Sequence, residues 1–245
     1  MRSARFCIYA AGLLVLPLAL AACDMGSGHD KVLGSVNIPS GSSVSDANTV
    51  NGAVNVASNA KAGDASTVNG SINVADGSQV ADAETVNGSI KLGERATAKK
   101  ATTVNGSVTL DRGATVNGDA TTVNGDLRLA PGATVHGSLT NVNGHITVDG
   151  AHIGAGITTA NGNIDITGNA VVDGGIKVEE SKGILTVHLG KDKLPRIVVG
   201  PGATVNGPLD FERPVTLYIS DQAHVSGPIN GAQAVKFSGA TPPAS

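Results

Sequence analysis

The chain has 245 residues, enough for one or two domains, and its net charge of −3 with 15% charged residues leaves no basic surface for a nucleic-acid partner. Glycine is abundant, at 33 residues, whereas 2% of the residues are aromatic and none is tryptophan. A globular core of this size normally contains many more aromatic rings, so this interior must be filled in another way.

The chain begins with an expected export signal over residues 1–22. Arg2 and Arg5 form a basic head, and residues 6–20 are an almost unbroken apolar run that is too short for a convincing membrane span. The run ends in Leu-Ala-Ala-Cys, which resembles a bacterial lipoprotein signal, and this resemblance implies that Cys23 becomes the lipidated first residue. An ordinary secretory signal with a chance cysteine is the alternative.

Residues 23–32 are expected to tether the chain to a membrane. Acyl chains such as palmitate contribute about 0.8 kcal/mol per buried methylene, and more than one chain anchors a protein stably. We therefore expect the protein on the periplasmic side of the cell envelope. Asp24 resembles the signal that retains some lipoproteins in the inner membrane, with the outer membrane as the alternative. Cys7, the only other cysteine, would be removed, so the mature chain has no disulfide.

A repeated Thr-Val-Asn-Gly motif follows the tether. Its asparagines recur every 18 or 19 residues: Asn51, Asn69, Asn87, Asn105, Asn124, Asn143 and Asn161. A fixed period of this length indicates a solenoid. Ile72 and Val74 flank Asn73, and this alternation predicts short strands. We predict an all-β, single-stranded, three-sided parallel β-helix over residues 33–178, with about 18 residues per coil.

The motif is interpreted as a corner of each coil. Asn-Gly tolerates a positive φ, and stacked asparagines can hydrogen-bond along the axis as a structural ladder. The valines, such as Val68 and Val86, are expected to point inward as part of a six-residue aliphatic repeat. The threonine before each valine is expected to face outward: Thr49, Thr67, Thr85, Thr103 and Thr122.

Residues 179–245 are expected to form irregular final coils and a C-terminal cap. The spacing breaks after Glu179, and the three aromatic residues that remain after signal removal, Phe211, Tyr218 and Phe237, all lie here. Natural solenoids cover their ends because an open end exposes an unpaired strand edge. Self-assembly of the protein would need at least one weakly capped end, and the short segment 33–45 is the candidate for it.

Two stretches, GATVHGSL (132–139) and GATVNGPL (202–209), resemble the bactofilins. These bacterial scaffold proteins form polymers and fold as right-handed, three-sided β-helices, so the resemblance implies that fold and a polymer-forming role. The chain differs from them in its export signal, because bactofilins act on the cytoplasmic side. The repeats are also similar to β-helical domains of surface adhesins. A left-handed β-helix of the hexapeptide acyltransferase type is the alternative to the favoured right-handed form.

Chemistry-bearing residues are scattered along the repeats. His136, His145 and His152 fall close together in sequence and would suit a general base or a metal site, but each flanks an inward aliphatic residue and is expected on the solvated surface. The same holds for a set of carboxylates: Asp111, Asp119, Asp126, Asp149 and Asp165. A basic cluster is interpreted as soluble surface: Arg95, Lys99 and Lys100.

We therefore predict no catalytic residue, no metal and no cofactor. The expected function is that of a non-enzymatic, membrane-anchored envelope lipoprotein, acting as a β-helical scaffold or interaction element. Its expected partners are the membrane and either copies of itself or an envelope protein or polysaccharide. An adhesin-like surface binding module is the second hypothesis, and a hexapeptide-type acyltransferase is the third.

Overall fold

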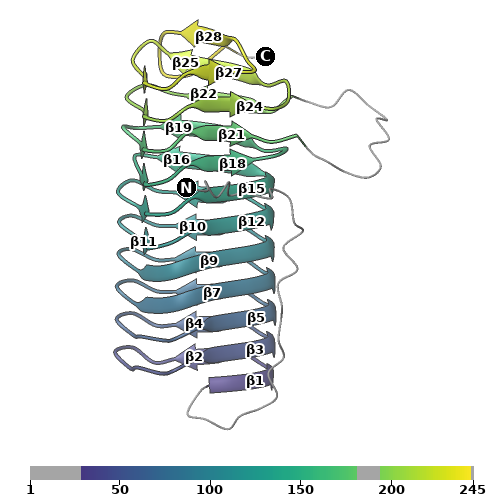
Figure 1. Cartoon of the computed structure of the whole chain (residues 1–245). Helices are drawn as coiled ribbons and strands as arrows, with labels where there is room; N and C mark the ends of the chain where they lie inside the picture. The colour runs from purple at the N-terminus through teal and green to yellow at the C-terminus, as the bar shows by residue number, and fades with distance from the viewer. Residues whose placement is uncertain (1–28, 181–193, 244–245) are drawn as a thin grey trace, which may run out of the picture.

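The computed structural model describes residues 29–180 and 194–243, and these residues form a parallel β-solenoid (Figure 1). Its coils stack from the N-terminal end to the C-terminal end, and every strand pairing is parallel. The strands form a sheet of 17 and a sheet of 11. Among the described residues, no helix is long and apolar enough to cross a membrane. The predicted all-β fold is confirmed.

Each coil has three sides, which we call faces 1, 2 and 3. Face 1 is the 11-stranded sheet: β2 Val36–Ile38, β4 Val54–Val56, β6 Ile72–Val74, β8 Ile90–Leu92, β10 Val108–Leu110, β13 Leu127–Leu129, β16 His145–Asp149, β19 Asn163–Thr167, β22 Arg196–Val199, β25 Thr216–Ser220 and β28 Ala234–Phe237. Face 2 is built of two-residue strands: β11 Thr115–Val116, β14 Thr134–Val135, β17 His152–Ile153, β20 Val171–Val172, β23 Thr204–Val205 and β26 His224–Val225.

Face 3 carries the repeated motif: β1 His29–Leu33, β3 Ala47–Asn51, β5 Ala65–Asn69, β12 Ala120–Asn124, β15 Leu139–Asn143, β18 Ile157–Thr159, β21 Ile176–Val178, β24 Leu209–Phe211 and β27 Ile229–Asn230. Two longer strands run over faces 2 and 3 without a break: β7 Gln79–Asn87 and β9 Thr97–Asn105. With 11 strands on face 1 and a spacing of about 4.8 Å between strands, the rod is roughly 50 Å long.

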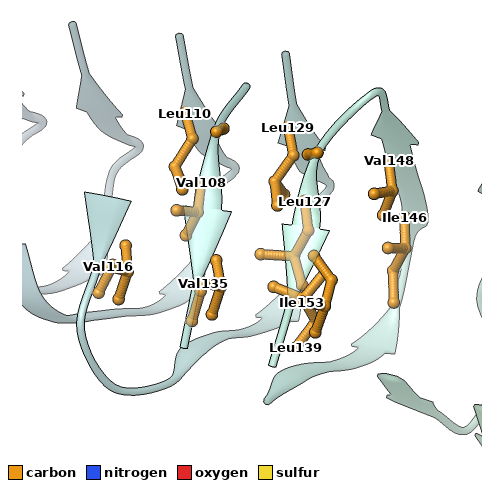
Figure 2. Close-up of a cluster of buried hydrophobic side chains, with 14 of the residues drawn as sticks. Val108, Leu110, Val116, Leu127, Leu129, Val135, Leu139, Ile146, Val148 and Ile153 are labelled. Carbon is orange, nitrogen blue, oxygen red and sulfur yellow. The ribbon is translucent and has the colours of Figure 1, made fainter. Parts of the chain in front are cut away.

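Like residues stack on like residues throughout the rod. Ile72 pairs with Ile90, and Val74 pairs with Leu92. Figure 2 shows how aliphatic side chains from neighbouring coils, including Val108 on β10 and Leu127 on β13, line the interior in rows. Both are fully buried. A single coil cannot bury these side chains by itself, so each coil depends on its neighbours for its core.

The threonines of the motif are buried, and the prediction that they face outward is wrong. Thr67 is 2% exposed and Thr103 is 0% exposed, whereas Val68 and Val86 are partly exposed. Alternation along face 3 places the threonine inside together with the residue two positions before it, and places the valine outside. The expected inward six-residue repeat therefore fails at the valines of this motif.

A hydrogen bond explains why a polar side chain occupies the interior. The Oγ1 atom of Thr103 donates to the carbonyl oxygen of Gly88 in the preceding coil at 2.8 Å, and Thr67 bonds Gly52 in the same way at 2.9 Å. We call this set the inner ladder: Thr49, Thr67, Thr85, Thr103, Thr122 and Asn141. A buried carbonyl without a partner is costly, and the hydroxyl supplies that partner where the chain turns.

The motif glycines are required for close stacking more than for backbone conformation. A Cβ atom on Gly70 would lie 1.8 Å from the carbonyl oxygen of Gly52, and one on Gly88 would lie 1.9 Å from that of Gly70. Of the seven motif glycines, only Gly52 and Gly144 have a positive φ, at 158° and 145°. The expectation that the corner needs a positive φ is therefore wrong for most of the coils.

The solenoid continues beyond residue 178. Ile164 pairs with Ile197, Ile197 pairs with Leu217, and Leu217 pairs with Ala234, so three further strands keep the register of face 1. The break in spacing is a longer connection between β21 and β22, and residues 181–193 of it lie outside the described residues.

Both ends of the rod leave apolar side chains exposed. At the N-terminal end Leu33, in the segment 33–45 that was expected to be weakly capped, is 75% exposed, whereas Val36 and Ile38 are 0% and 1% exposed. In the last coil Ile229, which pairs with the buried Leu209, is 37% exposed. The described residues after Phe237 add no further strand. The last coil is therefore open as well.

Candidate functional site

The motif asparagines form a second ladder on the outside of the rod, which we call the outer ladder. Each Nδ2 atom donates to the Oδ1 atom of the asparagine in the preceding coil, at 2.9 Å for the pair Asn69–Asn51 and 3.0 Å for Asn161–Asn143. The remaining bonds join Asn87, Asn105, Asn124 and Asn143 to their predecessors, each at 2.9 Å. The hydrogen bonds expected from the sequence are present, and their amides are exposed.

All amides of the outer ladder point the same way, so their dipoles add along the rod. The oxygen atoms face the C-terminal end, where the Oδ1 atom of Asn161 accepts a hydrogen bond from the Arg213 guanidinium. Arg213 also donates to the carbonyl oxygen of Ala160 at 3.2 Å. A cation at the negative end of aligned dipoles is stabilising, as it is at a helix C-terminus. This role of Arg213 was not predicted from the sequence, because Arg213 lies 52 residues from Asn161.

A shorter asparagine ladder lies on face 1. Asn55 donates to Asn37 at 2.8 Å, and Asn73 donates to Asn55 at 2.9 Å. These three residues line a shallow groove of about 560 Å³, together with Pro39 and the small residues that follow each strand. The Lys91–Asp111 ion pair, at 3.2 Å, also lies along the groove. The lining of the groove is mostly apolar, and the amides of the three asparagines are among its polar groups.

The three histidines are not brought to one place. His136 follows β14 on face 2, His145 begins β16 on face 1, and His152 begins β17 on face 2. His136 is exposed, and His145 and His152 keep 40% and 43% of their side-chain surface exposed. Their expected place on the solvated surface is confirmed. No group of three or more potential metal-ligating side chains is found in the part of the chain that the structure describes.

Two of these histidines pair with aspartates of the next coil. The Nε2 atom of His145 lies 2.9 Å from Oδ2 of Asp165, and this hydrogen bond raises the pKa of His145 above its usual 6.5. His152 lies 2.7 Å from Asp173, and hydrogen bonds from His152 and Asn206 lower the pKa of Asp173.

Several other charged residues also bond to neighbouring coils. Arg196 contacts the second oxygen of Asp165 at 3.3 Å, and Lys100 contacts Glu84 at 3.2 Å. Asp119 and Asp126 accept hydrogen bonds from the backbone N–H groups of residues one coil further on. The five aspartates singled out from the sequence are at least partly exposed: Asp111, Asp119, Asp126, Asp149 and Asp165. Arg95 and Lys99 are also exposed. These charges are distributed along the rod and converge on no reactive centre.

A small apolar cluster lies outside the main core near the C-terminal end. It consists of Val198, Tyr218 and Phe237, and the Arg196 guanidinium lies 5.4 Å from the centre of the Tyr218 ring. Tyr218 alternates with the core residues Leu217 and Ile219, so its ring is on the outer side of face 1. These aromatic residues were expected in irregular final coils and a cap, whereas Tyr218 lies on the outside of a regular strand.

The expected signal and anchor residues, 1–22 with Cys23 and Asp24, lie outside the described residues. No protein-family model matches the chain, and comparison with curated proteins and with solved structures gives no significant match. Three surfaces of the described residues are candidates for an interaction with a partner: the outer ladder, the face 1 groove and the open last coil.

Proposed function

We propose that this protein is a non-enzymatic, lipid-anchored scaffold or interaction element of the bacterial cell envelope. The observation that supports this most is the rod itself, in which outward polar side chains bond to the same position of the next coil. Catalysis needs a nucleophile, an acid or base and a stabilising donor around one reacting atom. Here the two His–Asp pairs lie on different faces.

The proposed anchor sets the orientation of the rod. Cys23 precedes β1 by six residues, so the N-terminal end lies within about 20 Å of the acyl chains. Val32 and Leu33, at 65% and 75% exposed, lie on this membrane-proximal edge strand. The open last coil is then held roughly 50 Å from the bilayer. The outer faces and this end are available to an envelope protein, a polysaccharide or a second copy.

The anchor is tested by Cys23→Ser in the full chain expressed in a bacterium. We expect the wild type to incorporate labelled palmitate and to sediment with membranes, and the variant to lose the label and move to the soluble periplasmic fraction. Cys7→Ser is the matched control, because this cysteine lies in the segment that would be removed. An unlabelled wild type would contradict the lipoprotein assignment.

The choice between scaffold and binding module is tested by negative-stain microscopy of the mature Cys23→Ser chain over a range of concentrations. Filaments whose repeat matches the rod length support the polymer-forming role that the bactofilin resemblance implies. Discrete rods at every concentration contradict self-assembly and leave the adhesin-like binding module. In that case the partner is to be sought on the outer faces.

A further inference from the structure

Asparagine followed by glycine is a chemically labile pair. The backbone nitrogen of glycine attacks Cγ of the asparagine side chain, the side-chain nitrogen leaves as ammonia with the displaced proton, and a cyclic imide forms. Water then opens the imide at either carbonyl, giving aspartate or isoaspartate, so the reaction needs no enzyme, oxidant or reductant. Glycine favours the attack because it has no side chain to hinder it. The chain contains ten such pairs, at Asn51, Asn69, Asn87, Asn105, Asn117, Asn124, Asn143, Asn161, Asn206 and Asn230.

In the outer ladder, two hydrogen bonds oppose this reaction at a typical pair. The Asn87 amide donates to Asn69 and accepts from Asn105, so the carbon that would be attacked is held on both sides. The nucleophile is held as well, because the N–H of Gly88 donates to the carbonyl oxygen of Asn105 at 3.0 Å. Attack requires the amide to rotate and this N–H to leave its partner, and the stacked coils resist both movements.

One pair lacks the second bond to its amide and also the bond to its glycine N–H. Asn230 ends β27 on the last coil, where no further strand is stacked on it in the described residues. Its amide is exposed and bonded on one side only, donating to Oδ1 of Asp210 at 2.6 Å. The N–H of Gly231 makes no hydrogen bond within the described part of the chain, and the φ of this glycine is 81°.

We propose that Asn230 is a site of spontaneous deamidation and that the outer ladder shields the repeated Asn-Gly pairs from the same reaction. This inference is independent of the proposed function, since it requires only the coil geometry. Each of the remaining pairs keeps either a bonded glycine N–H or an amide bonded on both sides. Asn206, for example, donates to Asp173 at 3.1 Å, and the N–H of Gly207 bonds the carbonyl oxygen of Gly174.

The product would alter the open end of the rod. A carboxylate at position 230 loses the N–H donor to Asp210 and places two negative charges at hydrogen-bond distance, where like charges repel. Isoaspartate also adds a backbone atom, which shifts the register between β24 and β27. Both products weaken the pairing of the last coil, so the modification would loosen the end at which Ile229 is already exposed.

The test is peptide mapping by mass spectrometry of the full chain, incubated in mildly alkaline buffer with and without a high concentration of urea. In the folded protein we expect Asn230 to convert at least ~10-fold faster than Asn87, the factor expected from losing one or two hydrogen-bond restraints. In urea we expect the two rates to become similar. Equal rates in the folded protein, or a faster reaction at the ladder sites, would overturn the proposal.

Two variants test separately that the outer ladder shields its asparagines and that Asn230 is the reactive site. Asn105→Ala removes the amide that holds Asn87 on one side, so conversion of Asn87 should rise severalfold while that of Asn51 stays unchanged. Asn230→Gln should abolish conversion at position 230, because the longer side chain closes a larger and slower ring. Unchanged conversion of Asn87 in Asn105→Ala would overturn the shielding role of the ladder.

Discussion

The inner and outer ladders arise from the same four-residue motif but lie in opposite environments. Thr103 is fully buried and its side chain donates to a backbone carbonyl, whereas the side-chain amide of Asn105, two residues later, is exposed and bonds to other side-chain amides. When an inner bond is lost, no water replaces it, and the Gly88 carbonyl loses its donor. When an outer bond is lost, water takes its place. We therefore expect the hydrogen bonds of the two ladders to contribute very differently to the free energy of unfolding, although their lengths are similar.

The largest effect is expected at a motif glycine whose carbonyl oxygen accepts a bond of the inner ladder. Gly88→Ala places a methyl group 1.9 Å from the Gly70 carbonyl oxygen, so the coils must move apart. We expect a loss of at least ~3 kcal/mol in the free energy of unfolding, at the upper end of what overpacking costs. Urea denaturation followed by circular dichroism measures it. Ser66→Ala, on the outer side of face 3, is the control and should change stability by less than ~0.5 kcal/mol. Equal losses in the two variants would contradict the close-stacking role of the glycine.

The second-largest effect on stability is expected from the loss of one hydrogen bond of the inner ladder. Thr103→Val keeps the shape of the side chain but removes the hydroxyl that bonds Gly88. The unpaired carbonyl should cost about 1–3 kcal/mol in the free energy of unfolding, measured by the same denaturation. Thr121→Val is the matched control, because Thr121 is a partly exposed threonine of the same face. A loss no larger than that of Thr121→Val would show that the inner ladder contributes little.

A smaller effect is expected on the outside. Asn105→Ala removes two ladder bonds, to Asn87 and from Asn124, but water solvates the groups that are left. We expect the free energy of unfolding to fall by less than ~1 kcal/mol, because exposed hydrogen bonds contribute little net stability. If Asn105→Ala proved as destabilising as Thr103→Val, mutual polarisation of the stacked amides would contribute as much stability as burial does. The expected difference in stability between the two ladders would then be wrong.

The sequence predicted the solenoid and the outer ladder because both depend on a spacing that can be read directly. The aliphatic pairs such as Ile72 and Val74 keep strict alternation within one strand, and the face 1 register follows from them. The inner ladder was missed because hydrophobicity alone favours valine over threonine as the inward residue. A signal was available in the small or apolar residue two positions before each threonine, such as Ala65 and Ala83, which also faces the core.

Other features could not be read from local spacing. Arg213 reaches the outer ladder from 52 residues away, and the pairing of Ile164 with Ile197 crosses an irregular connection. The openness of the last coil depends on what stacks above Ile229, and no pattern within the repeat specifies that. These features depend on tertiary contacts between segments that are far apart in the sequence.

The smallest effect on stability is expected from the His145–Asp165 pair on face 1, and this effect depends on pH. His145 is hydrogen-bonded to Asp165, with Asp126 adding to the attraction and Arg128 opposing it, so its pKa in the folded protein lies above 6.5. A group whose pKa is raised by folding adds stability below its unfolded pKa, and this contribution disappears as the pH rises through the folded value. Relative to His145→Gln, the wild type should therefore be more stable at mildly acidic pH and lose this advantage in alkaline solution.

With 40% of the His145 side chain exposed, solvent screening should keep that difference below ~1 kcal/mol. Thermal unfolding of both proteins across this pH range measures the difference, and His136→Gln is the control, because His136 is exposed on another face. A difference that grew with rising pH would mean that burial of the ring outweighs its bond to Asp165. Desolvation would then determine the energetics of this pair on the outside of face 1, as it does for the buried hydrogen bonds of the inner ladder.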